Sequence, residues 1–234
     1  MREVHLWIGE DTLADAFDDI AELALACRFT DCRHETEPGC AVRAALEAGF
    51  DGIELHCTSG YLPAQFLSSG TNRRTDGYGG TAANRARFVL EVLAAMCEEA
   101  GSGRVGVRIC PGNPFNDLHD ENPHETFATL LDAVSPMKLA YLHVIRSPRR
   151  SLDAFALARE HFRGALIVND GFDRESADRV LGAGEAAAVS FGRSYIGNPD
   201  LVRRLREGLP LADFDLATLY TPGRKGYTDY PAAS

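Results

Sequence analysis

Segments with strand-like and helix-like patterns alternate along almost the whole chain, and this alternation constrains the fold more than any other feature. It is typical of α/β proteins, in which helices connect parallel strands. The sequence predicts strands at 52–56, 104–110, 139–145, 165–169 and 186–191, with a sixth at Val4–Ile8. It predicts helices at 12–28, 40–48, 84–100, 123–135, 151–162, 173–183 and 198–207. The long excursion at 57–83 and the tail from 208 carry no regular pattern.

The number of strands then limits the architecture. A closed β/α barrel has eight strands and about 250 residues, whereas this chain has 234 residues. Only about 50 residues precede the strand at 52–56, so the shortfall lies toward the N-terminus. No repeat, low-complexity segment or linker suggests a second domain. We therefore expect one α/β domain that folds as an incomplete TIM-type (β/α) barrel, with five to six of the eight strands.

Composition narrows the class of partner. The chain is 45% hydrophobic and 25% charged, as in ordinary soluble domains, and no apolar run approaches the ~20 residues of a membrane span. The start lacks the apolar centre of a signal peptide, and six sparse cysteines fit a reducing compartment, so we expect a cytoplasmic protein. A net charge of −10 disfavours nucleic acid. A small ligand with a phosphate remains compatible, because local amides and one arginine can outweigh the global charge.

Three side chains of types that are common in catalysis lie at the end of one strand. His56 ends the strand at 52–56, and Ser59 and Tyr61 come directly after it. Barrel enzymes gather their catalytic groups at such strand ends. An imidazole and a hydroxyl there can both donate hydrogen bonds to one carbonyl oxygen, and a tyrosine can act as general acid. The alternative is a buried histidine satisfied by the backbone, beside a tyrosine that only packs.

A cation and two glycine turns mark the later strands. Arg108 lies in the strand at 104–110, where alternate residues point inward, and a buried cation needs an anionic partner. That partner is either an anionic ligand or Glu54 on the neighbouring strand. The turns at 169–172 and 191–193 follow the last two strands, where barrels often bind phosphate through backbone amides. Arg193 can grip a phosphate through two parallel hydrogen bonds.

Together these motifs make the chain resemble the flavin-dependent ene-reductases of the old yellow enzyme family. The resemblance rests on the run at 41–61, on Asn72-Arg-Arg-Thr-Asp-Gly-Tyr-Gly-Gly followed by Asn84-Arg85, and on the terminal Gly226-Tyr-Thr-Asp-Tyr-Pro. It covers roughly residues 38–231. We therefore expect 1–234 to be a single partial flavin-oxidoreductase barrel domain, in which 1–37 diverge and 38–231 follow the family. The 72–85 motif and the terminal motif look structural, with the tail tucked into the barrel.

The resemblance implies a function and a set of roles. It implies an FMN-dependent oxidoreductase that uses NAD(P)H to reduce the C=C bond of α,β-unsaturated carbonyl compounds. His56 and Ser59 would hold the substrate carbonyl, Tyr61 would supply a proton, and Tyr220 would line the substrate pocket. The implied cofactor contacts are Arg108, Gly171, Phe172, Gly192 and Arg193. The sequence departs from the family at Ser59, which stands for Asn or His, at Cys57, which stands for Gly, and at Asp170, which stands for Gly.

Two other hypotheses follow from the residues. No counterpart of the family's first three strands is visible upstream of residue 38, so the chain could be a truncated, non-catalytic relative. It could also need a complementing subunit or a second copy of itself to bind flavin. A metal site is disfavoured, because Cys27, Cys32, His34 and Cys40 lack the paired spacing of zinc ligands, and His119 and His124 lie in a loop interrupted by proline.

Overall fold

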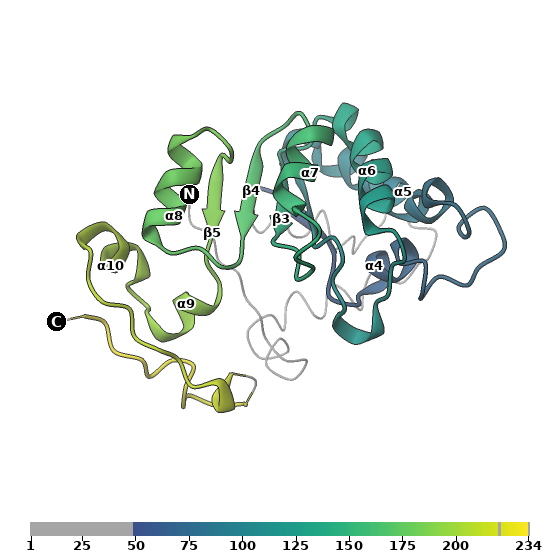
Figure 1. The fold of residues 1–234 in the computed structure, drawn as a ribbon. Helices are drawn as coiled ribbons and strands as arrows, with labels where there is room; N and C mark the ends of the chain where they lie inside the picture. The colour runs from purple at the N-terminus through teal and green to yellow at the C-terminus, as the bar shows by residue number, and fades with distance from the viewer. Residues whose placement is uncertain (1–48, 220, 234) are drawn as a thin grey trace.

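A five-stranded parallel sheet forms the centre of the protein in a computed structural model, which describes residues 49–219 and 221–233 (Figure 1). The strands lie in the order β1-β2-β3-β4-β5. They are β1 Ile53–Cys57, β2 Val105–Ile109, β3 Tyr141–Ile145, β4 Leu166–Asn169 and β5 Ala188–Ser190. The five predicted strands from 52 to 191 are thereby confirmed. The predicted strand at Val4–Ile8 and the predicted helices at 12–28 and 40–48 lie outside the described residues.

The strand order identifies the architecture. Each strand pairs in parallel with the next strand in sequence, as consecutive staves of a β/α barrel do. A doubly wound sheet would instead reverse its order at a switch point. The described residues therefore supply five consecutive staves of a TIM-type barrel, which confirms the expected incomplete barrel.

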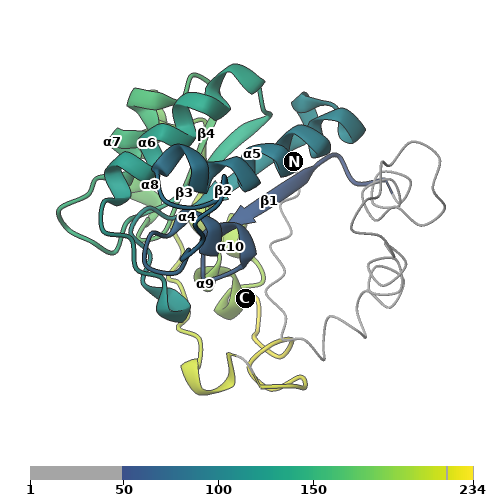
Figure 2. The ribbon, with the colours of Figure 1, turned by 90° about the vertical axis from the view of Figure 1, so that its right-hand side faces the viewer.

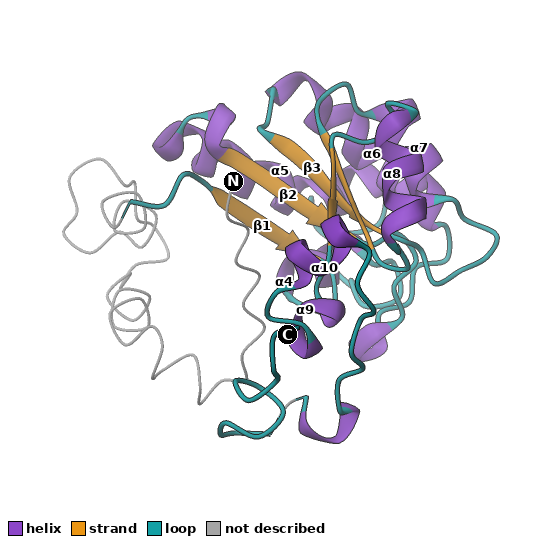
Figure 3. Cartoon of the chain, turned by 90° about the vertical axis from the view of Figure 1, so that its left-hand side faces the viewer, coloured by secondary structure: helices purple, strands orange, loops and turns teal. Residues whose placement is uncertain are grey.

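Helices connect these strands and cover one side of the sheet (Figures 2 and 3). They are α4 Leu62–Leu67, α5 Ala82–Ala100, α6 Pro123–Val134, α7 Ala154–His161 and α8 Arg174–Gly182. Two further helices, α9 Arg193–Gly197 and α10 Leu201–Glu207, follow β5. Short 3-10 turns lie at Ser102–Arg104, Phe115–Asp117, Ser135–Met137 and Leu216–Thr218. Each of the five helices predicted after residue 83 is confirmed. The sequence missed α4 and α9, because segments of six and five residues are too short to show helical periodicity.

Alternation along the strands gives the sheet two different faces. The face toward the helices is apolar, and its fully buried side chains include Val105, Val107, Ile109, Leu142, Val144 and Val168. The opposite face is polar and carries Glu54, His56, Arg108, His143, Asn169 and Ser190. Adjacent residues of a strand point to opposite faces, so one alternating pattern builds both the core and this polar face. Gly106 is required there, since a Cβ atom would lie 2.4 Å from the Tyr141 ring.

The long loop before α5 is held by its own motif. The Asn72 side chain donates to the carbonyl oxygens of Phe66 and Tyr78 at 2.8 and 2.7 Å. The Arg85 guanidinium is buried and donates to Leu67 O at 2.8 Å and to Thr126 Oγ1 at 2.7 Å. These contacts fix the loop to α5 and α6, in agreement with the structural role expected for the 72–85 motif.

The tail is mostly irregular, as predicted, but its contacts differ from the expected tuck into the barrel. Pro231 O accepts a hydrogen bond from Arg204 at 3.3 Å, and Ala233 N donates to Asp200 Oδ2 at 2.8 Å. Both partners belong to the α10 region, where Arg204 and Asp200 form a partly buried ion pair at 2.7 Å. This pair gives the tail polar anchors on α10. No helix in the described part of the chain is long and apolar enough to cross a membrane.

Candidate active site

The end of β1 brings His56 and Tyr61 together. The chain turns sharply after the strand, since Ser59 and Gly60 have φ values of 58° and 85°. Tyr61 then begins α4 as its N-cap residue, and its amide donates to Thr58 O at 3.2 Å. The two rings meet edge to face with centroids 5.2 Å apart. Tyr61 is 53% exposed, so a small molecule can reach its hydroxyl at the rim of the sheet.

Ser59 occupies a backbone conformation that favours other residues. A φ of 58° lies in the left-handed region, where asparagine is better tolerated than serine. The position therefore suits the Asn of the family pattern on backbone grounds as well. Its carbonyl oxygen accepts a hydrogen bond from Asn116 Nδ2 at 2.7 Å, which helps to hold the turn.

His56 is neutral at pH 7. Burial, followed by the nearby Arg108 cation, lowers the pKa of its imidazole from 6.5 to about 4, against an opposing effect of Glu54. Arg108 is the register partner of His56 on β2. A neutral imidazole can donate one hydrogen bond without adding positive charge. The site therefore places an uncharged donor beside a permanent cation.

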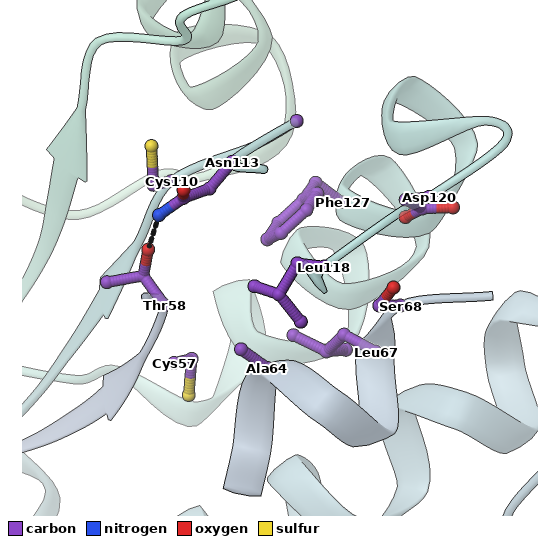
Figure 4. A pocket seen from close by; sticks show the side chains of 11 residues that line it. Cys57, Thr58, Ala64, Leu67, Ser68, Cys110, Asn113, Leu118, Asp120 and Phe127 are labelled. Atoms are coloured by element: carbon purple, nitrogen blue, oxygen red, sulfur yellow. Dashed lines mark hydrogen bonds between the residues drawn. The ribbon is translucent and has the colours of Figure 1, made fainter. Parts of the chain in front are cut away.

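A second loop locks the turn after β1, and sequence reasoning missed it. Asn113 Nδ2 donates to Thr58 Oγ1 at 2.8 Å (Figure 4). Asn116 packs so close that a Cβ atom on Gly60 would lie 2.4 Å from its Cβ. The left-handed φ angles of Asn116 and Asp117, 52° and 59°, shape this loop. Asn113 and Asn116 after a strand were the signal available in the sequence. Their spacing did not indicate that they contact the turn after β1.

The cavity in Figure 4 lies beneath this turn, between the ends of β1 and β2 and α4. Its lining includes Cys57, Thr58, Leu67, Cys110 and Phe127, and its free volume of about 20 Å³ has room for about one water molecule. It is too small for an enone or a flavin. Burial raises the pKa of both thiols, to about 12 for Cys110, so neither is a nucleophile at pH 7.

Arg108 lies within the polar face and not at its margin. It is 7% exposed, and its Nη2 donates to Asn169 Oδ1 at 3.1 Å. Glu54, the alternative partner considered from the sequence, has its Oε2 3.0 Å from His143 Nδ1. In the register of the sheet, Arg108 on β2 pairs with His56 on β1 and with His143 on β3.

The turns after β4 and β5 are joined to each other. Arg193 forms an ion pair with Asp170, so two of the groups expected near a phosphate neutralise each other. Asp170 and Gly171 both have left-handed φ angles, 76° and 74°. Phe172 packs toward α7, with its ring centroid 5.8 Å from that of Phe155 and 5.0 Å from the Arg146 guanidinium carbon.

A larger cavity adjoins Gly192. Its volume is about 320 Å³, which is within the range of small-molecule sites. Three tyrosines contribute to it, and two of them, Tyr227 and Tyr230, belong to the terminal motif identified in the sequence. The cavity is lined by Gly192, Tyr195, Ile196, Pro199, Tyr227, Thr228 and Tyr230. Clustered tyrosines near a glycine turn were the signal, although their meeting depends on how the tail docks.

Two sets of predicted residues remain. Tyr220, expected in the substrate pocket, lies outside the described residues, as do Cys27, Cys32, His34 and Cys40. Within 49–219 and 221–233, no group of three or more His, Cys, Asp or Glu side chains is arranged to hold a metal ion. The described part of the expected site thus consists of the β1 turn, Arg108 and the two later turns.

Comparison with known proteins places this geometry in context. Residues 36–212 match the model of the family described as NADH:flavin oxidoreductase / NADH oxidase. A probable flavin mononucleotide-dependent alkene reductase of Leishmania infantum is 45% identical over 195 residues, covering 82% of this chain and 53% of the relative. The 12-oxophytodienoate reductase 2 of Arabidopsis thaliana is 36% identical over 200 residues, covering 82% of this chain and 54% of the relative.

Solved structures agree with these relatives. The old yellow enzyme from Trypanosoma cruzi superposes with a TM-score of 0.78 at 36% identity, covering 82% of this chain and 52% of that one. Morphinone reductase in complex with tetrahydroNAD gives a TM-score of 0.77 at 36% identity, covering 97% of this chain and 58% of that one. The chain thus spans about half the length of the curated relatives that it matches.

Proposed function

Because the chain belongs to the NADH:flavin oxidoreductase / NADH oxidase family, we propose that it acts in FMN-dependent reduction of activated alkenes. The substrates are α,β-unsaturated carbonyl compounds, and NAD(P)H is the reductant. The observation that carries this proposal is the contact between His56 and Tyr61 beside the buried Arg108. A neutral donor, a proton donor and a cation meet there at the carboxyl end of neighbouring barrel strands, where barrel enzymes act.

Each residue has a distinct role in this proposal. His56 and Ser59 hold the carbonyl oxygen of the substrate and stabilise the negative charge that develops on it. Tyr61 donates a proton to the α-carbon, and its exposure at the rim lets solvent restore that proton. Bound FMN supplies the hydride that the β-carbon receives.

The polar face fits an anionic flavin. Arg108 is buried, donates to the neutral Asn169 amide and carries a permanent positive charge, which suits the pyrimidine edge of an isoalloxazine. Gly171, Gly192 and Arg193 hold the phosphate, and Phe172 supports their loop from the core side. Open space surrounds Gly192, since a Cβ atom there would meet nothing within 4 Å. A phosphate must compete with Asp170 for Arg193.

The activity is tested with a simple cyclic enone and NAD(P)H. We expect Tyr61→Phe and His56→Ala each to reduce kcat/KM by about 10²-fold or more, as loss of an acid or of a carbonyl donor does. Tyr78→Phe is the matched control, because the Tyr78 hydroxyl bonds to Glu91 at 2.9 Å, away from the polar face. Full activity in both site variants would refute the assigned roles.

A second candidate is a chain that needs a partner to bind flavin. The described residues supply five staves, whereas a closed barrel has eight, and a further copy or a separate subunit can supply the remainder. In that case, size measurement shows an oligomer, and flavin uptake depends on protein concentration or on the added subunit. A monomer that takes up one FMN rejects this candidate.

A further inference from the structure

Five polar side chains, one from each strand, form a continuous hydrogen-bonded chain across the polar face. Arg108 Nη2 lies 3.1 Å from Asn169 Oδ1, and Asn169 Nδ2 lies 2.8 Å from Ser190 Oγ. Ser190 Oγ lies 2.8 Å from His143 Nε2, and His143 Nδ1 lies 3.0 Å from Glu54 Oε2. The chain therefore runs from a permanent cation to a carboxylate.

This hydrogen-bonded chain of side chains lies in the interior of the protein. His143, Ser190 and Arg108 are only 1%, 3% and 7% exposed. Buried polar groups are costly unless they are hydrogen-bonded, so each link in the chain constrains the next. Asn169 joins Arg108 to the other three residues, because it contacts both the arginine and the serine.

The chemistry of the groups fixes the direction of the hydrogen bonds made by Asn169 and favours one order beyond it. A guanidinium can only donate, so the Asn169 oxygen must face Arg108 and its amide nitrogen must face Ser190. That nitrogen donates to both Ser190 Oγ and Ser190 O, at 2.8 and 2.9 Å. The Ser190 hydroxyl can donate its hydrogen to His143 Nε2, and in that arrangement His143 Nδ1 donates to Glu54. Each hydrogen along the chain has an acceptor in this order.

We propose that Asn169 is a positioning residue, which holds the Arg108 guanidinium in place through this directional chain of hydrogen bonds ending on Glu54. An asparagine suits this role better than a carboxylate, because it accepts from Arg108 without neutralising its charge. The consequence for catalysis rests on the proposed function, in which Arg108 faces the flavin. The arrangement of the side chains themselves does not depend on a flavin.

The first test therefore uses the protein without FMN. In ¹⁵N NMR spectra, with His143→Gln used for assignment, we expect a neutral His143 ring with its hydrogen on Nδ1. We also expect separate Nη signals for Arg108, because a guanidinium held by hydrogen bonds rotates slowly. These signals should merge in Asn169→Ala and stay separate in Asn169→Asp, which keeps the acceptor. They should also stay separate in Asn84→Ala, a control whose amide bonds to Gly79 O at 3.0 Å.

Either of two NMR results would overturn the proposal. One is a hydrogen on His143 Nε2 at neutral pH, which contradicts the direction of the chain. The other is an Arg108 spectrum that is identical in the wild type and Asn169→Ala. Circular dichroism of each variant confirms that it has folded, so a loss of signal separation reports on Arg108 and not on unfolding.

The second test measures flavin affinity in both redox states. Arg108 opposes the negative charge of reduced flavin, so Asn169→Ala should raise the ratio of Kd for reduced FMN to Kd for oxidised FMN about tenfold. Asn169→Asp should raise this ratio further, because its carboxylate offsets the cation, and Asn84→Ala should leave it unchanged. An unchanged ratio in both Asn169 variants rejects the positioning role. A wild type that binds no FMN rejects the proposed function, while the NMR result still decides on Asn169.

Discussion

At the scale of single residues, neighbouring groups in the site influence one another's charge. His56 is kept neutral by burial and by Arg108, and Arg108 keeps its charge beside a neutral asparagine. Asp170, in contrast, neutralises Arg193. The phosphate side of the proposed flavin site therefore carries an internal ion pair.

The lowered pKa of His56 predicts how stability depends on pH. The unfolded chain binds a proton near pH 6.5, whereas the folded one binds it near pH 4, so the unfolded state gains protons first as pH falls. The stability from neutral His56 is present above pH 6.5 and is lost between 6.5 and about 4. We expect a loss on the order of 2 kcal/mol between pH 7 and 4.5, discounted for partial solvent screening. Urea unfolding measures it, and an equal loss in His56→Gln would contradict the cause.

Asp170 predicts a gain of affinity on mutation. Asp170→Gly removes a left-handed non-glycine residue, with φ of 76°, and releases Arg193. We expect FMN to bind about tenfold more tightly, as an added hydrogen bond to a charged group does. Lys138→Gly is the control for backbone strain, because Lys138 also has a left-handed φ of 55° but lies far from this turn in the sequence. Calorimetric titration that shows equal or weaker FMN binding to Asp170→Gly would count against the phosphate site.

At the scale of elements, the site depends on how two loops meet. The turn after β1 and the loop after β2 are joined through Thr58 and Asn113, and through Gly60 and Asn116. Both loops leave neighbouring strands, which pair from Ile53 with Val105 to Cys57 with Ile109. The sheet therefore sets their separation, and the asparagines fix the remaining freedom of the turn that presents Tyr61.

Gly60→Ala tests this contact. The added methyl group meets Asn116 at 2.4 Å and also strains a backbone with φ of 85°. We expect a loss of about 3 kcal/mol of unfolding free energy, together with weaker enone binding. Gly80→Ala is the matched control, since Gly80 has φ of 81° but nothing within 4 Å of the added atom. Equal losses in the two variants would show that the loop contact contributes nothing.

At the scale of the whole molecule, the sequence predicted the repeating part of the fold and not its cross-connections. The five strands from 52 to 191 were predictable, because each is an apolar run that also supplies the core, such as Val105-Gly-Val-Arg-Ile109. The contact of His143 with Glu54 joins residues 89 positions apart, and no periodicity reports such a pair. The ion pair of Asp170 with Arg193 was not predicted, for the same reason. The β1 turn was found through its motif, whereas its supporting loop carries no motif of its own.

The position of Arg108 predicts that these strands bind a flavin, and titration with FMN measures that binding. We expect the purified protein to bind about one equivalent of FMN and to turn yellow. The visible spectrum follows the titration. Arg108→Met is predicted to weaken binding of reduced FMN about 10²-fold, because a buried charge partner is lost. A wild-type protein that binds no FMN in this titration, even at high protein concentration, would show that these strands do not present Arg108 to a flavin.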